Sequence, residues 1–524
     1  MKLNILVGGK AGQGINKVSL IISSILSKRG YFTFNYRDYP SLIRGGHNFN
    51  VLSVSDKKVG SIESKLDVII ALDEKTIELH KKELKKNGII IGCDEYCTIG
   101  RNANIAQAGA LIKILGIEKS LLVEEIKKEF PDNKEALESA EKGYDGKEKK
   151  FDLKKLNNQI KIMTGSSGVV EGAINSKINV FLGYPMTPAT GVLHELGMKQ
   201  TQYGHIVFEN ENEIAVANAG LGASYAGART MVGTSGGGFD LMTEALSFQG
   251  MSEIPLVVYL ATRPGPGTGI PTYSTQADLD VALRGGHGEF PRIVIAPGDP
   301  IECIEKTNEA FYLSEEYGAL SIILSDKHLA ESEFSSDRKP NKIIDFKITR
   351  KVPGEGIVKA NSYEHDEKGN TTEIPEIAKK ETDRRIAKYS AIKQELISSA
   401  DAEGRKKFQM IKIYGNKNAK NLIIGWGSTK TVILDALDAI DNSIETGKGD
   451  WKFLQVLYLK PISDEIRKEI EKAHKVILVE NNATGQLGRL IREKTGISIK
   501  NRILKYDGKP FYTDELREEI LRIK

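Results

Sequence analysis

Short apolar runs alternate with segments of helical periodicity along most of this chain of 524 residues. Near the N-terminus, KLNILVGG predicts a strand, and INKVSLIISSILSKRG, which follows it closely, predicts a helix that ends at a glycine. The next predicted strands are YFTFNY, NVLSVS, DVIIAL and GIIIGC. Because strands that alternate with helices favour parallel crossover units, we expect an α/β fold with mainly parallel sheets.

The chain divides into three such α/β blocks, which predict three domains. The first covers residues 1–150 and ends in charged helical segments, the second covers 163–335 and is rich in glycine and proline, and the third covers 419–524. Residues 336–418 are polar and charged, and we expect them to form a linker region with little core of its own. A chain of this length is too long for one hydrophobic core, which agrees with this division.

Composition and charge exclude several classes of function. The net charge is only +4, with lysines and glutamates interspersed, so nothing favours a nucleic-acid partner. No apolar run is long enough to span a bilayer, and the apolar N-terminal run is too short for a signal peptide. With only three cysteines there is no disulfide framework. We therefore expect a cytoplasmic protein without a membrane partner.

The same three cysteines limit metal chemistry. A cluster held by four thiolates needs more cysteines than Cys93, Cys97 and Cys303. Cys93 and Cys97 could join a metal site, but no second pair or nearby histidine completes one. We predict no metal site in this chain.

Polar and charged residues follow four predicted strands of the second block. Thr187 lies between two prolines in GYPMTPAT, and Glu213 opens a helix of small residues, where the helix dipole favours a carboxylate. Ser235 lies in GTSGGG, and Arg263 follows the strand LVVYLAT. Singly, each has an ordinary structural explanation. Because ligands of parallel sheets bind beyond the carboxyl ends of the strands, their joint occurrence predicts one shared crevice.

Two glycine-containing loops of the first block are less specific. GGKAGQG lies between a strand and a helix, where backbone N–H groups can meet an anion, but its spacing differs from the dinucleotide-binding pattern. In SLIRGGHNFN, Arg44 and His47 flank paired glycines. Either loop could contact a ligand or partner, or be a plain turn.

Taken together, these motifs closely resemble a known family. GKAGQGI and IRGGHNF resemble its γ domain, and GYPMTPAT, NEIAVANAGLGASYAGART, TSGGGFDLMTEAL, RPGPGTGIPT and GGHGE resemble its catalytic α domain. The later segments EHDEKGN, WGST, ENNATGQL and YDGKPF match as well. The chain thus resembles the α subunit of 2-oxoacid:ferredoxin oxidoreductases (the pyruvate and 2-oxoglutarate enzymes), with a γ domain fused in front. GSSGVVEGA departs from the GNEA that relatives often have, and Met186 and Ala189-Thr190 vary the proline motif, which affects substrate choice more than chemistry.

The resemblance implies a γ-like domain, a domain that binds the pyrimidine of thiamine diphosphate, and a third domain like the C-terminal domain of transketolases. It assigns Glu213 to the aminopyrimidine ring, where it would promote the imino tautomer, and Thr187 and Arg263 to the substrate carboxylate. Pro185 and Ser235 would contact the cofactor. Arg44 would help bind or gate coenzyme A, although a structural surface charge explains that arginine equally well.

The resemblance also implies a partner, because the chain contains no GDG motif for the diphosphate and Mg²⁺ and has too few cysteines for a cluster. A β subunit would supply both the Mg²⁺ site and a 4Fe–4S cluster, with thiamine diphosphate shared between the subunits. The implied reaction converts a 2-oxoacid and coenzyme A into acyl-CoA and CO₂, with electrons passed to ferredoxin.

Two alternatives remain open at this point. One is a catalytically silent paralogue that acts in assembly or regulation, and the other is a subunit of an aryl-pyruvate enzyme. No motif in the sequence separates pyruvate from 2-oxoglutarate or branched 2-oxoacids.

Overall fold

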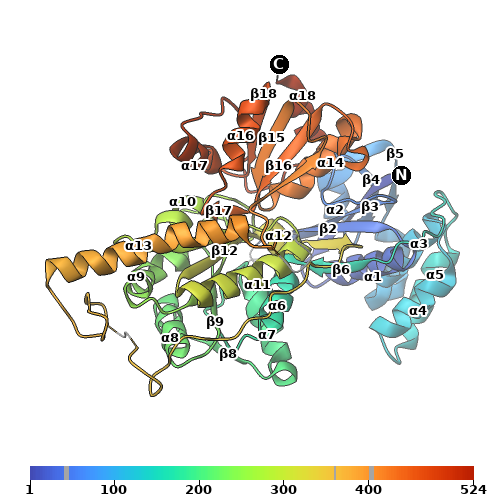
Figure 1. The fold of residues 1–524 in the computed structure, drawn as a ribbon. Coiled ribbons are helices and arrows are strands. Elements are labelled where there is room, and N and C mark those ends of the chain that lie inside the picture. The colour runs from blue at the N-terminus through green and yellow to red at the C-terminus, as the bar shows by residue number, and fades with distance from the viewer. Residues whose placement is uncertain (41–45, 359–360, 401–405, 524) are drawn as a thin grey trace. The chain divides into compact units, whose positions relative to one another are not determined.

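The computed structural model describes residues 1–40, 46–358, 361–400 and 406–523. They form two compact units (Figure 1). Unit 1 comprises Met1–Thr164, Ser332–Arg338 and Phe511–Glu518, and unit 2 comprises Gly165–Glu331, Lys339–Pro510 and Glu519–Lys524. The chain therefore returns to unit 1 twice after first leaving it.

Unit 1 contains one sheet and the helices around it. Its elements are β1 (Lys2–Lys10), α1 (Ile15–Lys28), β2 (Phe32–Asp38), β3 (His47–Ser55), β4 (Leu66–Ala71), α2 (Glu74–His80), the 3₁₀ helix η1 (Lys81–Glu83), β5 (Leu84–Ile91), the 3₁₀ helix η2 (Asp94–Asn102), α3 (Ala103–Ile114), α4 (Lys119–Glu129), α5 (Lys134–Asp145), β6 (Lys161–Thr164) and β13 (Glu333–Ser336). Helix α18 (Thr513–Arg522) begins in unit 1 and ends in unit 2.

The sheet of unit 1 has the order β5-β4-β1-β3-β2-β13-β6. Strands β1, β4 and β5 are parallel, whereas β3 pairs antiparallel with both β1 and β2, and β13 pairs antiparallel with β2 and β6. The predicted strand at 2–9 and the helix after it are confirmed as β1 and α1. The sheet is thus mixed, since only its β1-β4-β5 part has the parallel pairing expected of crossover units.

Unit 2 contains two sheets. The elements of its first part are α6 (Gly165–Asn175), β7 (Val180–Gly183), α7 (Thr190–Tyr203), β8 (Ile206–Glu209), α8 (Glu213–Tyr225), β9 (Thr230–Thr234), α9 (Gly236–Ser252), β10 (Leu256–Thr262), α10 (Leu279–Arg284), β11 (Arg292–Ile295), α11 (Pro300–Tyr317), β12 (Leu320–Asp326) and α12 (Lys327–Glu331). Those of its later part are α13 (Pro375–Ser398), β14 (Ile411–Gly415), β15 (Asn421–Trp426), α14 (Thr429–Asp441), α15 (Ser443–Thr446), β16 (Trp451–Val456), β17 (Tyr458–Lys460), α16 (Glu465–Lys472), β18 (Lys475–Glu480), α17 (Gln486–Thr495) and β19 (Asn501–Leu504).

The larger sheet of unit 2 is buried on both faces except at its edge strand β8, which is largely exposed. Its order is β17-β11-β12-β10-β9-β7-β8, and the six strands from β11 to β8 are parallel. Strand β10 is buried along its whole length. Its alternate residues Leu256, Val258 and Leu260 belong to one core cluster with Phe239 and Met242 of α9. The residues between them point to the other face, so the sheet has helices on both sides, as a parallel α/β sheet requires.

The smaller sheet has the order β14-β16-β15-β18-β19 and is parallel except for β14. Strand β17, only three residues long, follows β16 directly but does not join this sheet. It pairs antiparallel with β11 and so extends the larger sheet. Strands β16 and β17, which follow each other directly in sequence, therefore lie in different sheets of unit 2.

The connection between the two sheets contains a helix of 24 residues, α13, coloured orange in Figure 1. Only a few of its side chains are buried, among them Ile392 and Leu396. The carboxylate of Glu395 accepts hydrogen bonds of 2.6 Å from the hydroxyls of Tyr312 and Tyr317 on α11. A narrow apolar face and polar anchors hold this helix, which explains why its sequence looks like a solvated linker.

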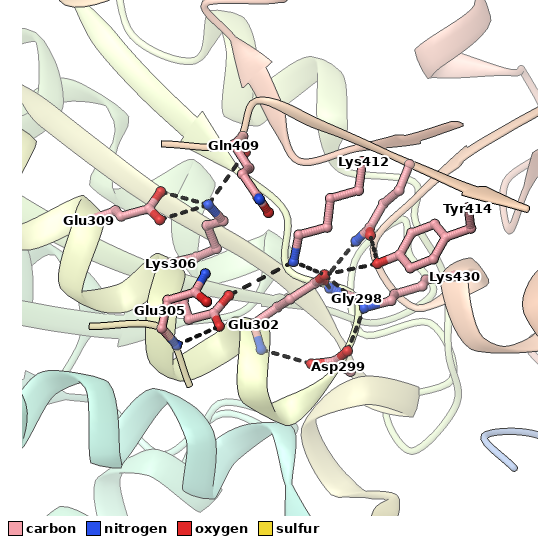
Figure 2. A network of polar contacts seen from close by, with 12 residues as sticks. Gly298, Asp299, Glu302, Glu305, Lys306, Glu309, Gln409, Lys412, Tyr414 and Lys430 are labelled. Atoms are coloured by element: carbon pink, nitrogen blue, oxygen red, sulfur yellow. Dashed lines mark hydrogen bonds and ion pairs between the residues drawn. The ribbon is translucent and has the colours of Figure 1, made fainter. Parts of the chain in front are cut away.

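A buried network of charges joins α11 to the smaller sheet (Figure 2). The carboxylate of Glu302 is fully buried and accepts hydrogen bonds from Lys430 at 2.7 Å, Lys412 at 2.9 Å and Gln455 at 2.7 Å. The backbone N–H of Gly298 donates to the same carboxylate at 2.8 Å. Lys430 also pairs with Asp299, the N-cap of α11. Each buried charge in this network thus has an opposite charge beside it, which burial requires.

We predict that Glu302→Gln lowers the free energy of unfolding by about 3 kcal/mol, because it leaves two buried ammonium groups without their shared carboxylate. The matched control is Glu465→Gln, which breaks an exposed pair with Lys406 at 3.2 Å and should cost less than about 1 kcal/mol. Chemical unfolding of both variants, followed by circular dichroism, measures the difference. Equal losses would show that the buried network contributes no more than a surface pair.

Candidate active site

The candidate site is built on four neighbouring parallel strands of the larger sheet of unit 2. Strands β10, β9, β7 and β8 lie in this order and end at Thr262, Thr234, Gly183 and Glu209. Because parallel strands share one carboxyl edge, the segments that follow them meet at the same side of the sheet. Arg263, Ser235, Thr187 and Glu213 lie on these segments, at the positions that the sequence predicts.

Arg263 joins two of these segments. Its Nη1 donates a 3.0 Å hydrogen bond to the backbone carbonyl of Thr187, so the arginine fixes the proline-rich loop after β7. Both residues are partly buried. Burial lowers the pKa of the Arg263 guanidinium, and the nearby charge of Glu213 partly offsets this effect. Within the described part of the chain, Nε and Nη2 of Arg263 form no hydrogen bond, so these two groups of the fork remain available for a ligand.

Glu213 is buried at the first turn of α8, with a side chain that is only 2% exposed. The turn is capped by Asn212, whose side chain accepts a hydrogen bond of 2.9 Å from the backbone of Ala215. Among the described residues, Glu213 Oε1 has no hydrogen-bond partner. A buried carboxylate without a partner is costly, so this arrangement indicates a ligand that supplies the missing donor.

The first turn of α9 approaches Glu213 so closely that only glycine fits at position 238. A Cβ atom at Gly238 would overlap Glu213 Oε1 and Thr234 Oγ1. Ser235, the N-cap of this helix, is fully buried, and its Oγ makes no capping hydrogen bond. Within the described part of the chain this hydroxyl has no partner. The small residues of TSGGG therefore leave room for the unpartnered side-chain oxygens of Glu213 and Ser235 in this turn.

Asp278 is a further candidate that the sequence analysis did not single out. Its Oδ2 is buried without a partner among the described residues, and it lies against Gly236 of the same first turn of α9. Burial and the charge of Asp240 raise the pKa of Asp278 from 3.8 to about 6. The sequence signal is weak, since Asp278 precedes α10 like an ordinary N-cap but makes no capping bond.

The segment that contains Asp278 is held by the smaller sheet. The side chain of Gln276 donates a 2.7 Å hydrogen bond to the carbonyl of Trp426 and accepts one of 2.9 Å from the backbone of Asn481. Trp426 ends β15, and Asn481 follows β18. The segments TQADL, GWGS and ENNATGQL, far apart in the sequence, therefore meet at one place.

Two other predicted residues have no contact within the described part of the chain that assigns them a role. Pro185 is exposed in the loop after β7, and no contact in the structure assigns it a role. Arg44 lies outside the described residues. Near it in sequence, the Nε2 atoms of His47 and His80 are 2.9 Å apart, and His80 Nδ1 is 2.8 Å from the carboxylate of Glu83. These three side chains form a hydrogen-bonded chain within unit 1.

Two kinds of feature are absent from the described ranges. Within them, no cluster of three or more His, Cys, Asp or Glu side chains has a metal-binding arrangement. No helix formed by these residues combines the length and the apolar character needed to cross a bilayer.

Comparison with known proteins gives a consistent result. The model described as pyruvate flavodoxin/ferredoxin oxidoreductase, thiamine diphosphate-binding, matches residues 171–397, and that of pyruvate ferredoxin/flavodoxin oxidoreductase matches residues 4–98. The α subunit of a 2-oxoacid:ferredoxin oxidoreductase from Sulfolobus is 28% identical, with 100% of this chain and 97% of that protein covered. The chain belongs to the 2-oxoacid:ferredoxin oxidoreductase family.

Other relatives in this family agree. The 2-oxoglutarate synthase subunit KorA of Archaeoglobus fulgidus is 38% identical over 177 residues, which cover 33% of this chain and 51% of that subunit. The structure of 2-oxoglutarate:ferredoxin oxidoreductase from Magnetococcus marinus, with 2-oxoglutarate, coenzyme A and succinyl-CoA bound, superposes with a TM-score of 0.87. It is 26% identical and covers 99% of both chains. This chain is thus a subunit of an oxidoreductase, and Thr187, Glu213, Ser235 and Arg263 all lie in its thiamine diphosphate-binding region.

We predict that Gly238→Ala lowers the free energy of unfolding by about 1–3 kcal/mol, because its methyl group must displace the Glu213 carboxylate or the helix. Gly237→Ala is the matched control on the same turn. Its Cβ would have Gly267 O, at 4.0 Å, as its nearest neighbour, and alanine favours the helix by up to about 1 kcal/mol. Urea unfolding of both variants tests this, and equal stability would show that Glu213 is not tightly packed.

Proposed function

We propose that this chain is the α subunit, with an N-terminally fused γ domain, of an enzyme that oxidatively decarboxylates a 2-oxoacid. The products are acyl-CoA and CO₂, and the two electrons released go to ferredoxin. The single observation that supports this most strongly is the buried carboxylate of Glu213, whose Oε1 has no hydrogen-bond partner among the described residues and which lies near the charge of Arg263 in the thiamine diphosphate-binding region.

The residues present fit thiamine diphosphate. Glu213 Oε1 and Ser235 Oγ are buried polar atoms without partners within the described chain, and the absence of a Cβ at Gly238 lets the Glu213 carboxylate pack against the first turn of α9. We assign Glu213 to a nitrogen of the aminopyrimidine ring, and Ser235 and Pro185 to the adjoining surface. When bound, this cofactor supplies a nucleophilic carbon and then accepts the electron pair released as CO₂ leaves. Glu213 holds the proton at the ring nitrogen.

Arg263 and Thr187 suit the substrate carboxylate. The Nε and Nη2 groups of the guanidinium form no hydrogen bond among the described residues, and a planar fork matches a carboxylate. The Thr187 hydroxyl adds one neutral donor from a loop that the same arginine holds. The two residues would keep the 2-oxoacid oriented while its carbon–carbon bond breaks.

The remaining parts of the reaction need other chains or domains. The absence of a GDG motif and the presence of only three cysteines support a β subunit that supplies the Mg²⁺ and diphosphate site and a 4Fe–4S cluster. We assign residues 1–150 to the γ domain, 163–335 to pyrimidine binding, 336–418 to the linker region and 419–524 to a transketolase-like C-terminal domain. We assign coenzyme A binding to the first domain, with Arg44 as one contact, and we place the complex in the cytoplasm.

The direct test is reconstitution with the β subunit. We expect the complex, supplied with thiamine diphosphate, Mg²⁺ and coenzyme A, to reduce ferredoxin with a 2-oxoacid, whereas this chain alone should bind no cofactor tightly and show no cluster absorbance. A panel of pyruvate, 2-oxoglutarate, branched and aryl 2-oxoacids identifies the substrate. No turnover with any of them would favour a silent paralogue.

We predict that Glu213→Gln lowers the turnover of the reconstituted complex by about 100-fold or more, because the amide cannot hold the proton at the cofactor ring. Glu244→Gln on the exposed face of α9 is the control and should turn over normally. Thermal unfolding checks that both variants fold. Near-normal oxidation by Glu213→Gln would remove this residue from the mechanism.

Arg263 and Thr187 should differ in their importance. A charge-assisted hydrogen bond is worth roughly 1.5–3 kcal/mol and a neutral one about 0.5–1.5 kcal/mol, so Arg263→Ala should lower kcat/KM about 10- to 150-fold and Thr187→Ala about 2- to 10-fold. Arg263→Lys should recover only part of the loss. Steady-state kinetics with several 2-oxoacids measures these effects. A defect confined to one substrate would instead place Arg263 in the side-chain pocket.

A further inference from the structure

A cavity in unit 2 is lined by residues of β17, α10, α13 and α17, four elements whose positions Figure 1 shows. Its volume is about 400 Å³, which is within the range of small-molecule sites. None of its lining residues belongs to the candidate active site. The cavity therefore needs an explanation of its own.

The charges around this cavity are unbalanced. Four cationic side chains line it, from α10, α13, β17 and α17: Arg284, Lys393, Lys460 and Lys494. Glu493 is the one acidic residue among the lining residues. Its carboxylate is shared between Arg284 and Lys494, while Lys393 pairs with Asp464 at 2.8 Å.

None of these ion pairs includes Lys460. Its ammonium donates to the carbonyl of Leu283 at 3.2 Å and lies 5.2 Å from the ring of Tyr389. No described carboxylate forms an ion pair with it. Burial and the neighbouring cations Arg292, Lys494 and Arg284 together lower the pKa of Lys460 from 10.5 to about 8, and the charge of Glu493 opposes the shift. A desolvated ammonium among like charges is favourable only with an anion beside it.

The rest of the lining is apolar. Leu459 and Ile462 are buried residues on either side of Lys460, and Leu283 and Leu490 lie on the facing helices. Pockets that combine apolar walls with a few directed charges are typical of small organic ligands. The apolar area would contact the body of a ligand and Lys460 its charged group.

We propose that this cavity binds a small organic anion, whose carboxylate or phosphate group pairs with Lys460 and whose apolar body packs against Leu459 and Ile462. This cavity is distinct from the substrate site at the strand ends, because the two sites share no residue. The proposal does not depend on the reaction assigned to the active site.

The experiment measures binding by isothermal titration calorimetry to the full chain, in complex with its β subunit where the two are produced together. Phenyl phosphate and phenylacetate are the probes, since they share an aromatic body and differ in the anionic group. We expect millimolar or tighter binding of at least one of them, and the preferred probe identifies the head group. Failure of both to bind would overturn the proposal.

Variants locate the binding. Lys460→Met keeps the length of the side chain but removes its charge, so affinity should fall at least about tenfold, as expected for a lost charge-assisted contact. Lys500→Met, at an exposed position outside the cavity, should bind like the parent chain. Glu493→Gln removes the carboxylate that competes with the ligand and should bind more tightly, which provides a test even if Lys460→Met does not fold. Unchanged affinity in both cavity variants would contradict the proposal.

The pH dependence gives a separate test. The groups that face Lys460 are Arg284 from α10, Arg292 from β11, Tyr389 and Lys393 from α13, and Glu493 and Lys494 from α17. Since only the protonated amine attracts an anion, affinity should fall about tenfold between pH 7 and pH 9 as Lys460 loses its proton. The fall should be much smaller in Lys460→Met. An equal fall in the parent and the variant would exclude Lys460 as the binding group.

Discussion

The parallel alignment of β10, β9, β7 and β8 is the constraint on which the candidate site depends. It places the ends of four strands at one edge, and the segments that follow them contribute Arg263, Ser235, Thr187 and Glu213. Helices α8 and α9 begin at the same edge, so their free backbone N–H groups add to its positive potential. Burying Glu213 there without a partner makes folding less favourable, and a ligand that supplies the donor offsets that cost.

Local patterns were sufficient to predict the elements of this edge. Apolar runs identify the buried strands, and polar residues within a few positions after such a run mark the strand end, so the positions of Thr187, Glu213 and Arg263 beyond strand ends could be predicted without any structure. The hydrogen bond between Arg263 and the carbonyl of Thr187 could not, since it joins residues 76 positions apart and depends on strand order. Asp278 was missed for the same reason. Its raised pKa comes from burial and from the charge of Asp240, and the sequence around Asp278 reveals neither.

Outside the site, two elements have only weak short-range patterns. Strand β17 has three residues and looks like the end of a longer apolar run, yet its pairing with β11 places it in the larger sheet. Helix α13 buries so little apolar area that its sequence resembles a solvated connection. In both cases contacts between distant segments, rather than local propensity, determine the structure.

The sheet of unit 1 has a consequence for how the gene can be divided. Strand β13 lies between β2 and β6 in that sheet, although it follows the six parallel strands of the larger sheet of unit 2 in sequence. A polypeptide that stopped after β6 would leave the edges of β2 and β6 unpaired, with exposed N–H and C=O groups that favour aggregation. Two separate chains would need either a circular permutation or a strand donated from one product to the other. The interleaved connectivity therefore opposes fission of this gene at its first domain boundary.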